Sequence, residues 1–220
     1  TYYVRLLQEK GLTREAVAHM RLFISGSAPL LPETFNAFRE RTGQTILERY
    51  GMTEGGMFTS NPLEGERRGG TVGFPLPGTG VRVVGEDDVP LSAGGIGHIQ
   101  VRGDNVFAGY WQMPERTQEE FTPDGFFRTG DMGRFDADGY LAIIGRDKDL
   151  IISGGLNVYP KEIEEAIDAL PGVAESAVIG LPHPDFGEAV TAVVVRGRDA
   201  SGLTAEGIIA ALKGNIAGFK

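Results

Sequence analysis

Cysteine is absent from the 220 residues, which excludes disulfide bonds, thiolate catalysis and a cysteine-based zinc site. Long apolar runs are missing too, since no stretch reaches the roughly 18 apolar residues of a membrane-spanning helix. Basic side chains number 21 against 30 acidic ones, and the formal net charge is −9. A general nucleic-acid surface is therefore not expected, although a local basic pocket for a small anion is compatible with this charge.

The overall composition is typical of a globular protein. Apolar residues make up 41% and charged residues 23%, and the length suits one large domain or two small ones. We expect small-molecule partners rather than nucleic acid or membrane, and a reducing cytoplasm suits a chain without cysteine. The sequence does not indicate an oligomeric state. Glycine is the outlier, with 33 residues against a usual share of about 7%, which predicts many tight turns or close backbone approaches to a ligand.

The first part of the chain, residues 1–69, reads as the edge of an α/β sheet. Residues 2–8 are predicted to be helical, and residues 20–25 (MRLFIS) to form a buried strand. A helix is predicted from Pro32, a favoured first position, to a C-terminal cap at Gly43. Residues 45–50 are predicted to form the next strand.

The rest of the chain divides into two further parts. Residues 70–146 alternate short β-rich runs with turns, and Asp138-Gly139 signals a hairpin, so a small antiparallel sheet or distorted barrel is expected. Residues 147–220 are expected to form an incomplete α+β domain. Its elements would be a strand at 150–153, a helix from Pro160, strands with the sequences SAVIGL and VTAVVV, and a helix from about Thr204 that includes Ile216. The predicted boundary therefore lies between residues 146 and 147.

Four short motifs carry residue types suited to chemistry. They are Ser25-Gly26-Ser27-Ala28-Pro29, Tyr50-Gly51-Met52-Thr53-Glu54, Arg128-Thr129-Gly130-Asp131, and Gly145-Arg146-Asp147-Lys148-Asp149 with Ser153-Gly154-Gly155. Each also has an ordinary structural interpretation. A glycine-rich strand end is often a plain turn, an Arg-Thr-Gly-Asp loop a solvated turn, and a run of alternating charges an exposed linker.

Taken together and in this order, the motifs resemble the adenylate-forming superfamily of acyl-CoA synthetases, luciferase-like enzymes and peptide-synthetase adenylation domains. Residues 69–78, 101–111 and 159–164 are similar to this superfamily as well. The resemblance implies the C-terminal part of a large AMP-binding domain (residues 1–146) followed by a small lid domain (residues 147–220). It also implies a reaction in which a carboxylate attacks the α-phosphate of ATP and a thiol, here coenzyme A, then displaces AMP.

The resemblance assigns roles residue by residue. Thr53 and Glu54 would be catalytic, with the Thr53 hydroxyl on the α-phosphate and the Glu54 carboxylate on Mg²⁺, which prefers hard oxygen ligands. Asp131 would bind the ribose hydroxyls, and Arg146 would hold the ribose or phosphate side. The other implied ATP or AMP contacts are Ser27, Ala28, Pro29, Tyr50, Gly51 and Met52.

The boundary segment has an implied mechanical role. Lys148 would be the hinge about which the small domain rotates between the two half-reactions, and Ser153, Gly154 and Gly155 would line the passage for the pantetheine arm of coenzyme A. The alternative is an ordinary flexible linker.

The acid implied by the resemblance is malonate. Residues 2–7 (YYVRLL) resemble the malonyl-CoA synthetase segment whose arginine binds the non-reacting carboxylate, so Arg5 would take that role with help from Ser27. Met57 would lie beside the methylene carbon. Residues 19–30, 59–68 and 181–190 are similar to the same subfamily. The alternatives are a surface position for Arg5, plain packing for Met57, and a ligase for another acid or an adenylation domain that loads a carrier protein.

The superfamily has two elements outside the resembling stretch. Its phosphate loop would precede Thr1, and its catalytic lysine would follow Lys220. We therefore expect the isolated 220-residue chain to lack synthetase activity.

Overall fold

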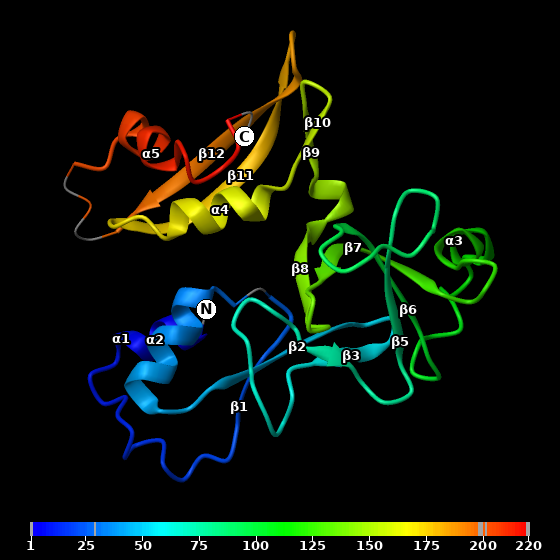
Figure 1. Cartoon of the computed structure of the whole chain (residues 1–220), viewed down its shortest axis with the longest axis horizontal. Coiled ribbons are helices and arrows are strands. Elements are labelled where there is room, and N and C mark those ends of the chain that lie inside the picture. Colours follow the sequence, from blue (N-terminus) through cyan, green and yellow to red (C-terminus); the bar gives the residue numbers. More distant parts are fainter. Residues whose placement is uncertain (1, 29, 198–199, 201, 219–220) are drawn as a thin grey trace. The chain divides into compact units, whose positions relative to one another are not determined.

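The structure, a computed structural model, describes residues 2–28, 30–197, 200 and 202–218. It divides into two compact units, one ending at Ile143 and one beginning at Ile144 (Figure 1). Each unit has its own core and is described by itself. The boundary predicted between residues 146 and 147 stays a prediction.

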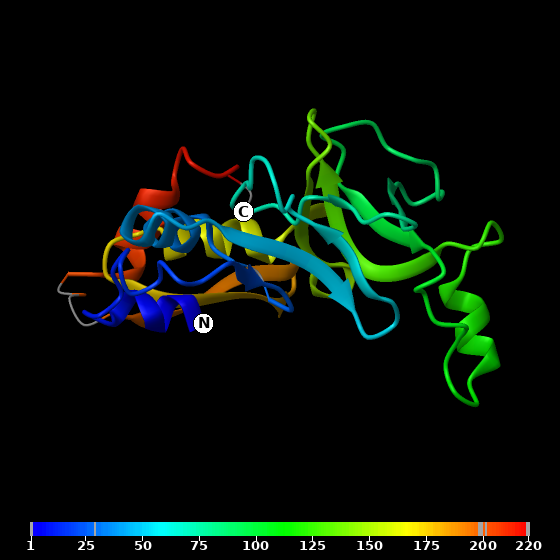
Figure 2. The ribbon, with the colours of Figure 1, turned by 90° about the horizontal axis from the view of Figure 1, so that it is seen from below.

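The first part of unit 1 is a small α/β sheet. Its elements are α1 (Tyr2–Gln8), β1 (Phe23–Ser25), α2 (Pro32–Thr42), β2 (Ile46–Met52), β3 (Gly56–Ser60) and β4 (Phe74–Pro75). The sheet order is β1-β2-β3-β4, with β1 parallel to β2 and the other neighbours antiparallel. Helices α1 and α2 pack together through the rings of Tyr3 and Phe38, whose centroids are 5.1 Å apart (Figures 1 and 2).

Local sequence signals explain most of this part. Helix α2 begins at Pro32 and ends before Gly43, whose φ of 73° lets its N–H bond to the Arg39 carbonyl at 2.8 Å. The helix and the strand that follows it are therefore confirmed. The predicted buried strand at 20–25 is wrong in extent and burial, because β1 begins at Phe23 and Ile24 is 42% exposed. As the end strand in the described sheet order, β1 leaves one edge uncovered.

The second part of unit 1 is the predicted antiparallel sheet. The sheet order is β5 (Gly80–Val84), β6 (Gly97–Arg102), β7 (Phe127–Phe135) and β8 (Leu141–Arg146), and β8 continues past Ile143 into unit 2. Gly139, at φ 86°, closes the β7–β8 hairpin as expected. An unpredicted helix, α3 (Pro114–Glu120), lies between β6 and β7 and projects from the sheet (Figure 2).

One apolar core joins the two sheets of unit 1. Tyr50 and Phe58 from the first sheet pack with side chains of the second, namely Val83, Ile99, Val101, Phe127 and Leu141. The region around the end of β2 is therefore held against β6 and β7 by burial of apolar surface.

Unit 2 has the α+β composition expected from its sequence. After the 3₁₀ turn η1 (Asp147–Asp149) come β9 (Ile151–Ser153), β10 (Leu156–Val158), α4 (Pro160–Asp168), β11 (Val173–His183), β12 (Gly187–Arg196) and α5 (Ala205–Leu212). The antiparallel sheet order is β10-β9-β12-β11, and α4 and α5 contribute to one core with it (Figure 1). Strand β10 was not predicted. Helix α5 ends at Leu212, so the expectation that it includes Ile216 was wrong.

No helix in the described part of the chain is long and apolar enough to cross a membrane.

Candidate functional site

The ends of two parallel strands bring the first two motifs to one edge of a sheet. Ser25 of β1 pairs with Glu48 of β2, so the segment after β1 and the turn after β2 leave the sheet in the same direction. Ser27 is exposed and has φ 67°, an uncommon backbone state outside glycine. The buried carboxylate of Glu48 accepts a hydrogen bond from the Leu30 N–H at 3.3 Å and so anchors the far end of this segment.

The segment itself matches the prediction only in part. Ser27 and Ala28 are exposed at the sheet edge, where a backbone approach by a ligand is possible. Pro29 lies outside the described residues. Sequence reasoning did not identify Glu48, and its only signal was a carboxylate at a position of β2 that follows two buried apolar residues.

The second motif runs from strand β2 into a tight turn. Tyr50, Gly51 and Met52 end the strand, and Thr53-Glu54-Gly55 connects it to β3. A side chain at Gly51 cannot fit, because a Cβ there would lie 1.9 Å from the Gly56 carbonyl oxygen. The Thr53 side chain is exposed and has no hydrogen-bond partner among the described residues, which leaves its hydroxyl accessible to a ligand.

Glu54 is held by the segment between β6 and α3. Its carbonyl accepts a hydrogen bond from the Phe107 N–H at 2.7 Å, and its Oε1 accepts one from the Tyr110 hydroxyl at 3.1 Å. Burial, and then the bond to Glu54, raise the pKa of Tyr110. Asn105 adds a bond from Nδ2 to the Gly55 carbonyl at 2.6 Å. The resemblance covered residues 101–111, but these three contacts were missed.

Glu54 can supply one hard oxygen to a metal. In the described part of the chain, no group of three or more His, Cys, Asp or Glu side chains could hold a metal ion. Mg²⁺ commonly keeps several waters and binds through one or two carboxylates together with substrate phosphates. The half-buried Glu54 carboxylate fits that mode of binding, and an all-protein cage does not fit.

Asp131 sits in a bulge of strand β7. Residues Gln100 and Arg128 are paired, and so are His98 and Met132, so three residues of β7 face the single residue Ile99 of β6. Gly130 supplies the left-handed backbone that the bulge needs, at φ 70°.

The Thr129 hydroxyl completes this bulge. It accepts from the Asp131 N–H at 3.1 Å and donates to the Ile99 carbonyl at 2.8 Å. The hydroxyl thus substitutes for a ladder hydrogen bond that the bulge interrupts.

The bulge brings the third motif to the second. The Tyr50 hydroxyl donates to Oδ2 of Asp131 at 2.5 Å, and both residues are buried. The two residues are 81 positions apart in the sequence, and both were assigned to nucleotide binding. The Asp131 carboxylate is thus bonded to Tyr50 of the second motif, and a carboxylate can accept further hydrogen bonds, as from a pair of hydroxyls.

Arg5 lies on α1, which is firmly attached to the sheet. The Tyr3 hydroxyl donates to the Ile24 carbonyl at 2.7 Å, and the Arg41 guanidinium donates to the carbonyls of Leu7, Glu9 and Leu12. Arg5 itself is exposed and has no ion-pair or hydrogen-bond partner in the described part of the chain.

Met57 is half-buried on β3, where it pairs with Gly51. The structure therefore brings Met57 to the second motif, but it gives no contact between Arg5 and Ser27.

The remaining predicted residues belong to unit 2. Arg146 ends β8, and Lys148 lies in η1; both side chains are exposed. Gly154 and Gly155 form the two-residue turn of the β9–β10 hairpin, with φ values of 58° and 79°, and Ser153 pairs with Leu156 across it. Two successive positive φ angles describe a type I′ turn. The turn alone therefore explains the presence of both glycines, without a role in binding coenzyme A.

Known proteins resemble the chain over its whole length. The family described as AMP-binding enzyme matches residues 1–111, and the AMP-binding enzyme C-terminal domain matches residues 162–220. A sulfoacetate–CoA ligase of Cupriavidus necator is 48% identical over 183 residues, covering 82% of this chain and 36% of the relative. A malonate–CoA ligase of Arabidopsis thaliana is 43% identical over 204 residues, covering 89% of this chain and 33% of the relative.

A solved structure extends the likeness to three dimensions. The crystal structure of ATP-bound MatB from Rhodopseudomonas palustris is 57% identical, with a TM-score of 0.96, and the match covers 100% of this chain and 44% of that one. The chain thus spans about a third of the length of the two curated relatives. The motif order, the fold and these matches together show that the chain belongs to the AMP-binding, adenylate-forming enzyme family.

Proposed function

We propose that the chain is part of an ATP-dependent acyl-CoA ligase that activates malonate as an acyl-adenylate and transfers the acyl group to coenzyme A. The observation that carries this proposal is the Tyr50–Asp131 pair, buried at 2.5 Å next to the exposed Thr53-Glu54 turn. This arrangement offers a hydroxyl-binding carboxylate and a phosphate-facing hydroxyl within one site. The chain covers only part of its relatives, so the proposal concerns the complete enzyme that contains this sequence.

The proposed reaction has two steps. A carboxylate oxygen of the acid bonds to the α-phosphorus of ATP, and pyrophosphate leaves. The thiol sulfur of coenzyme A then bonds to the acyl carbon, and AMP leaves. In the first step an anion approaches a polyanion, so hydrogen-bond donors and positive charge must offset the repulsion.

The residues of unit 1 divide this task. Thr53 donates its hydroxyl to the α-phosphate, and Asp131 accepts hydrogen bonds from the ribose. Glu54 would hold Mg²⁺, and the bound metal would neutralise phosphate charge. Tyr110 keeps the Glu54 carboxylate oriented through its 3.1 Å hydrogen bond. Ser27 and Ala28 flank the adenine with their exposed backbone. The role of Arg146, a permanent cation in unit 2, rests on the resemblance alone.

The acid is recognised through its second anion. An exposed guanidinium such as that of Arg5 can bind a carboxylate with two parallel hydrogen bonds. Malonate carries one carboxylate to react and another to be held, and Met57 limits the space beside its methylene carbon. Binding of the distal carboxylate orients the proximal carboxylate for attack on the α-phosphate.

Sulfoacetate is a second candidate acid. The curated relative named for it is 48% identical to this chain, whereas the relative named for malonate is 43% identical. Its sulfonate, like a carboxylate, is an anion one carbon from the reacting group. The role of Arg5 is the same for either acid, and the geometry of the distal anion distinguishes them.

The test compares acids in the complete enzyme. We expect kcat/KM for malonate to exceed that for propionate, and Arg5→Ala to reduce the malonate value by a factor on the order of 100 while propionate changes little. Arg5→Lys should recover only part of the loss, because a point charge cannot reproduce the donor fork. An equal loss for malonate and propionate would make Arg5 structural, and a preference for sulfoacetate over malonate would select the second candidate.

A further inference from the structure

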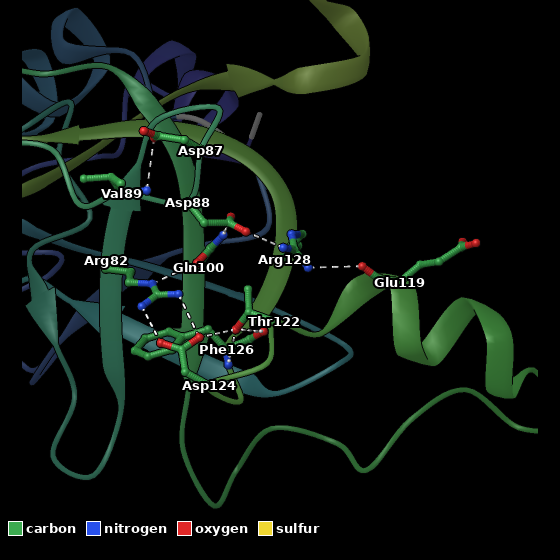
Figure 3. Close-up of polar contacts among 10 residues, drawn as sticks. All are labelled: Arg82, Asp87, Asp88, Val89, Gln100, Glu119, Thr122, Asp124, Phe126 and Arg128. Atoms are coloured by element: carbon green, nitrogen blue, oxygen red, sulfur yellow. Dashed lines mark hydrogen bonds and ion pairs between the residues drawn. The ribbon is translucent and has the colours of Figure 1, made fainter.

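The carboxylate of Asp88 bridges two strands of the antiparallel sheet. Its Oδ1 accepts a hydrogen bond from Nε2 of Gln100 on β6, and its Oδ2 accepts one from the Arg128 guanidinium on β7, both at 2.5 Å. Gln100 and Arg128 are direct partners in the β6–β7 ladder. Figure 3 shows the carboxylate between the two side chains. One side chain therefore connects a matched pair of residues on neighbouring strands.

The bridge belongs to a row of side chains across three strands. Arg82 of β5 pairs with Gln100, and its Nε donates to Oε1 of Gln100 at 2.8 Å. The same guanidinium donates two hydrogen bonds to the Asp124 carboxylate, at 2.7 and 3.1 Å. Its central carbon lies 3.9 Å from the centroid of the Phe126 ring (Figure 3). Since Arg82 occupies the amide oxygen of the buried Gln100, its amide nitrogen must face Asp88.

The backbone of Asp88 is fixed by the turn between β5 and β6. Its N–H bonds to the Gly85 carbonyl at 3.1 Å, and the Gly85 N–H bonds to the Val89 carbonyl at 3.0 Å. Asp88 has φ 59°, a left-handed state that aspartate and asparagine tolerate better than most residues. The tight turn thus holds the carboxylate over the ladder.

The position of the bridge in the ladder gives it a consequence. Arg128 is the last regularly paired residue before the bulge at Thr129-Gly130-Asp131, and pairing resumes only at Met132. A strand with extra residues has alternative registers, and a slip of one residue would turn each side chain to the opposite face. At this point a slip would move the Asp131 carboxylate away from the Tyr50 hydroxyl.

The value of the bridge is therefore geometric more than energetic. The side chains of Arg128 and Asp88 are 35% and 40% exposed, and exposed ion pairs contribute little stability. What the bridge restricts is which residue of β7 lies opposite Gln100. Arg128 is held from its other side as well, because it donates to the Glu119 carbonyl at 3.2 Å.

We infer that Asp88 and Arg128 are positioning residues for nucleotide binding: their ion pair fixes the register of β7 and so places Asp131. The inference rests on the proposed function, in which Asp131 binds the ribose of ATP. Neither Asp88 nor Arg128 needs to touch the nucleotide. Their effect reaches it through the three-residue bulge and the Thr129 hydroxyl.

The first test measures ATP binding to the complete enzyme by calorimetry with Mg²⁺ present. Asp88→Asn keeps the left-handed backbone preference but removes the charge that Arg128 pairs with, and we expect it to weaken ATP binding about fivefold. Arg128→Gln should weaken ATP binding at least as much, because it also removes the bond to the Glu119 carbonyl. The double variant should be no worse than Arg128→Gln, because the contact between Asp88 and Arg128 is already lost in that single variant. The matched control is Asp87→Asn, which removes the same charge from the adjacent residue. Among the described residues, the Asp87 carboxylate accepts a single hydrogen bond, from the Val89 N–H. This control should bind ATP like the wild type.

The second test separates positioning from a general loss of structure. Hydrogen exchange followed by mass spectrometry should show faster exchange in residues 127–135 of Asp88→Asn, with residues 46–52 unchanged. In steady-state kinetics the KM for ATP should rise while the KM for the acid stays the same.

The outcomes distinguish this inference from the function on which it rests. If Asp131→Asn weakens ATP binding and Asp88→Asn does not, the register role is overturned and the proposed function stands. If neither variant changes ATP binding, the role of Asp131 fails and the inference fails with it. Unchanged exchange in residues 127–135 also overturns the register role, whatever the affinities are.

Discussion

The hydroxyl of Tyr110 donates to Oε1 of Glu54 at 3.1 Å, and this contact joins the segment before α3 to the turn after β2. Burial raises the pKa of Tyr110, and the bond to Glu54 raises it further. The tyrosine therefore stays protonated and remains a donor through the physiological pH range. A second contact, from the Phe107 N–H to the Glu54 carbonyl at 2.7 Å, fixes the backbone of the same residue.

Glu54→Gln should damage the complete enzyme mainly by weakening Mg²⁺ binding, because the amide keeps an oxygen but loses its charge. Raising the Mg²⁺ concentration should restore part of the activity. Tyr110→Phe leaves the carboxylate intact and removes only its orienting bond, so we expect a smaller increase in the Mg²⁺ requirement, about threefold. Activity measured across a Mg²⁺ titration checks both variants. If excess Mg²⁺ restores no activity to Glu54→Gln, Glu54 is not the metal ligand.

Lys148→Pro should separate the two half-reactions of the complete enzyme. Lys148 lies in the 3₁₀ turn η1, whose backbone angles are close to those that proline imposes. Proline should therefore be tolerated in this conformation and should restrict any other. We expect adenylate formation to survive better than acyl transfer, measured by pyrophosphate release and by thioester formation from preformed adenylate. Equal losses in the two assays would show that Lys148 is not the hinge.

Arg41→Ala should destabilise the attachment of α1. The guanidinium donates to the carbonyl of Leu7 in the last turn of that helix and to the carbonyls of Glu9 and Leu12 in the segment that follows it. Losing these bonds should lower the free energy of unfolding by about 1–3 kcal/mol, measured by urea denaturation. Arg39→Ala is the matched control. Arg39 is exposed and lies 6.0 Å from the Phe35 ring centroid, so its loss should change stability little.

Asp124 should make a pH-dependent contribution to stability. Hydrogen bonds from Arg82, and then from Thr122, lower its pKa from 3.8 to about 2. A carboxylate with a lower pKa in the folded state stabilises the protein above its unfolded-state pKa, and this stability is lost as the pH falls through the folded-state value.

The comparison of the wild type with Asp124→Asn checks this. The difference in their urea midpoints should be constant above about pH 5 and should shrink as the pH falls from about 4 toward 2. Asp87→Asn serves as the charge-matched control. A difference that does not change across this range would contradict the role of the ion pair with Arg82.

Local signals in the sequence predicted a large part of the fold. Pro32 and Gly43 mark the ends of α2 because each satisfies a backbone requirement of a helix terminus. Gly139 marks the β7–β8 hairpin for a similar reason. Tyr50 and Asp131 were both assigned to the nucleotide through resemblance, and the structure places them in contact.

The parts that were missed depend on contacts between distant segments. Helix α3 has no buried residue in its sequence PERTQEE, so it lacks the apolar periodicity from which a helix is predicted. The bulge before Asp131 cannot be recognised without the β6 strand opposite it. The bond between Tyr110 and Glu54 spans 56 residues and joins segments that follow strands of different sheets, so no local pattern predicts it.

The separation of Tyr50 and Asp131 by 81 residues also bears on the order in which the chain folds. Strands β11 and β12 pair from His183 and Gly187 outward, so their hairpin closes through local contacts. The core of unit 1 instead joins Tyr50 and Phe58 to Leu141, and such non-local contacts form more slowly because long loops must close first. We therefore expect the β11–β12 hairpin to form early and the Tyr50–Asp131 bond late. During synthesis the bond between Tyr50 and Asp131 cannot form until β7 has been made, whereas the contacts of α1 with α2 can form as soon as Phe38 has been made.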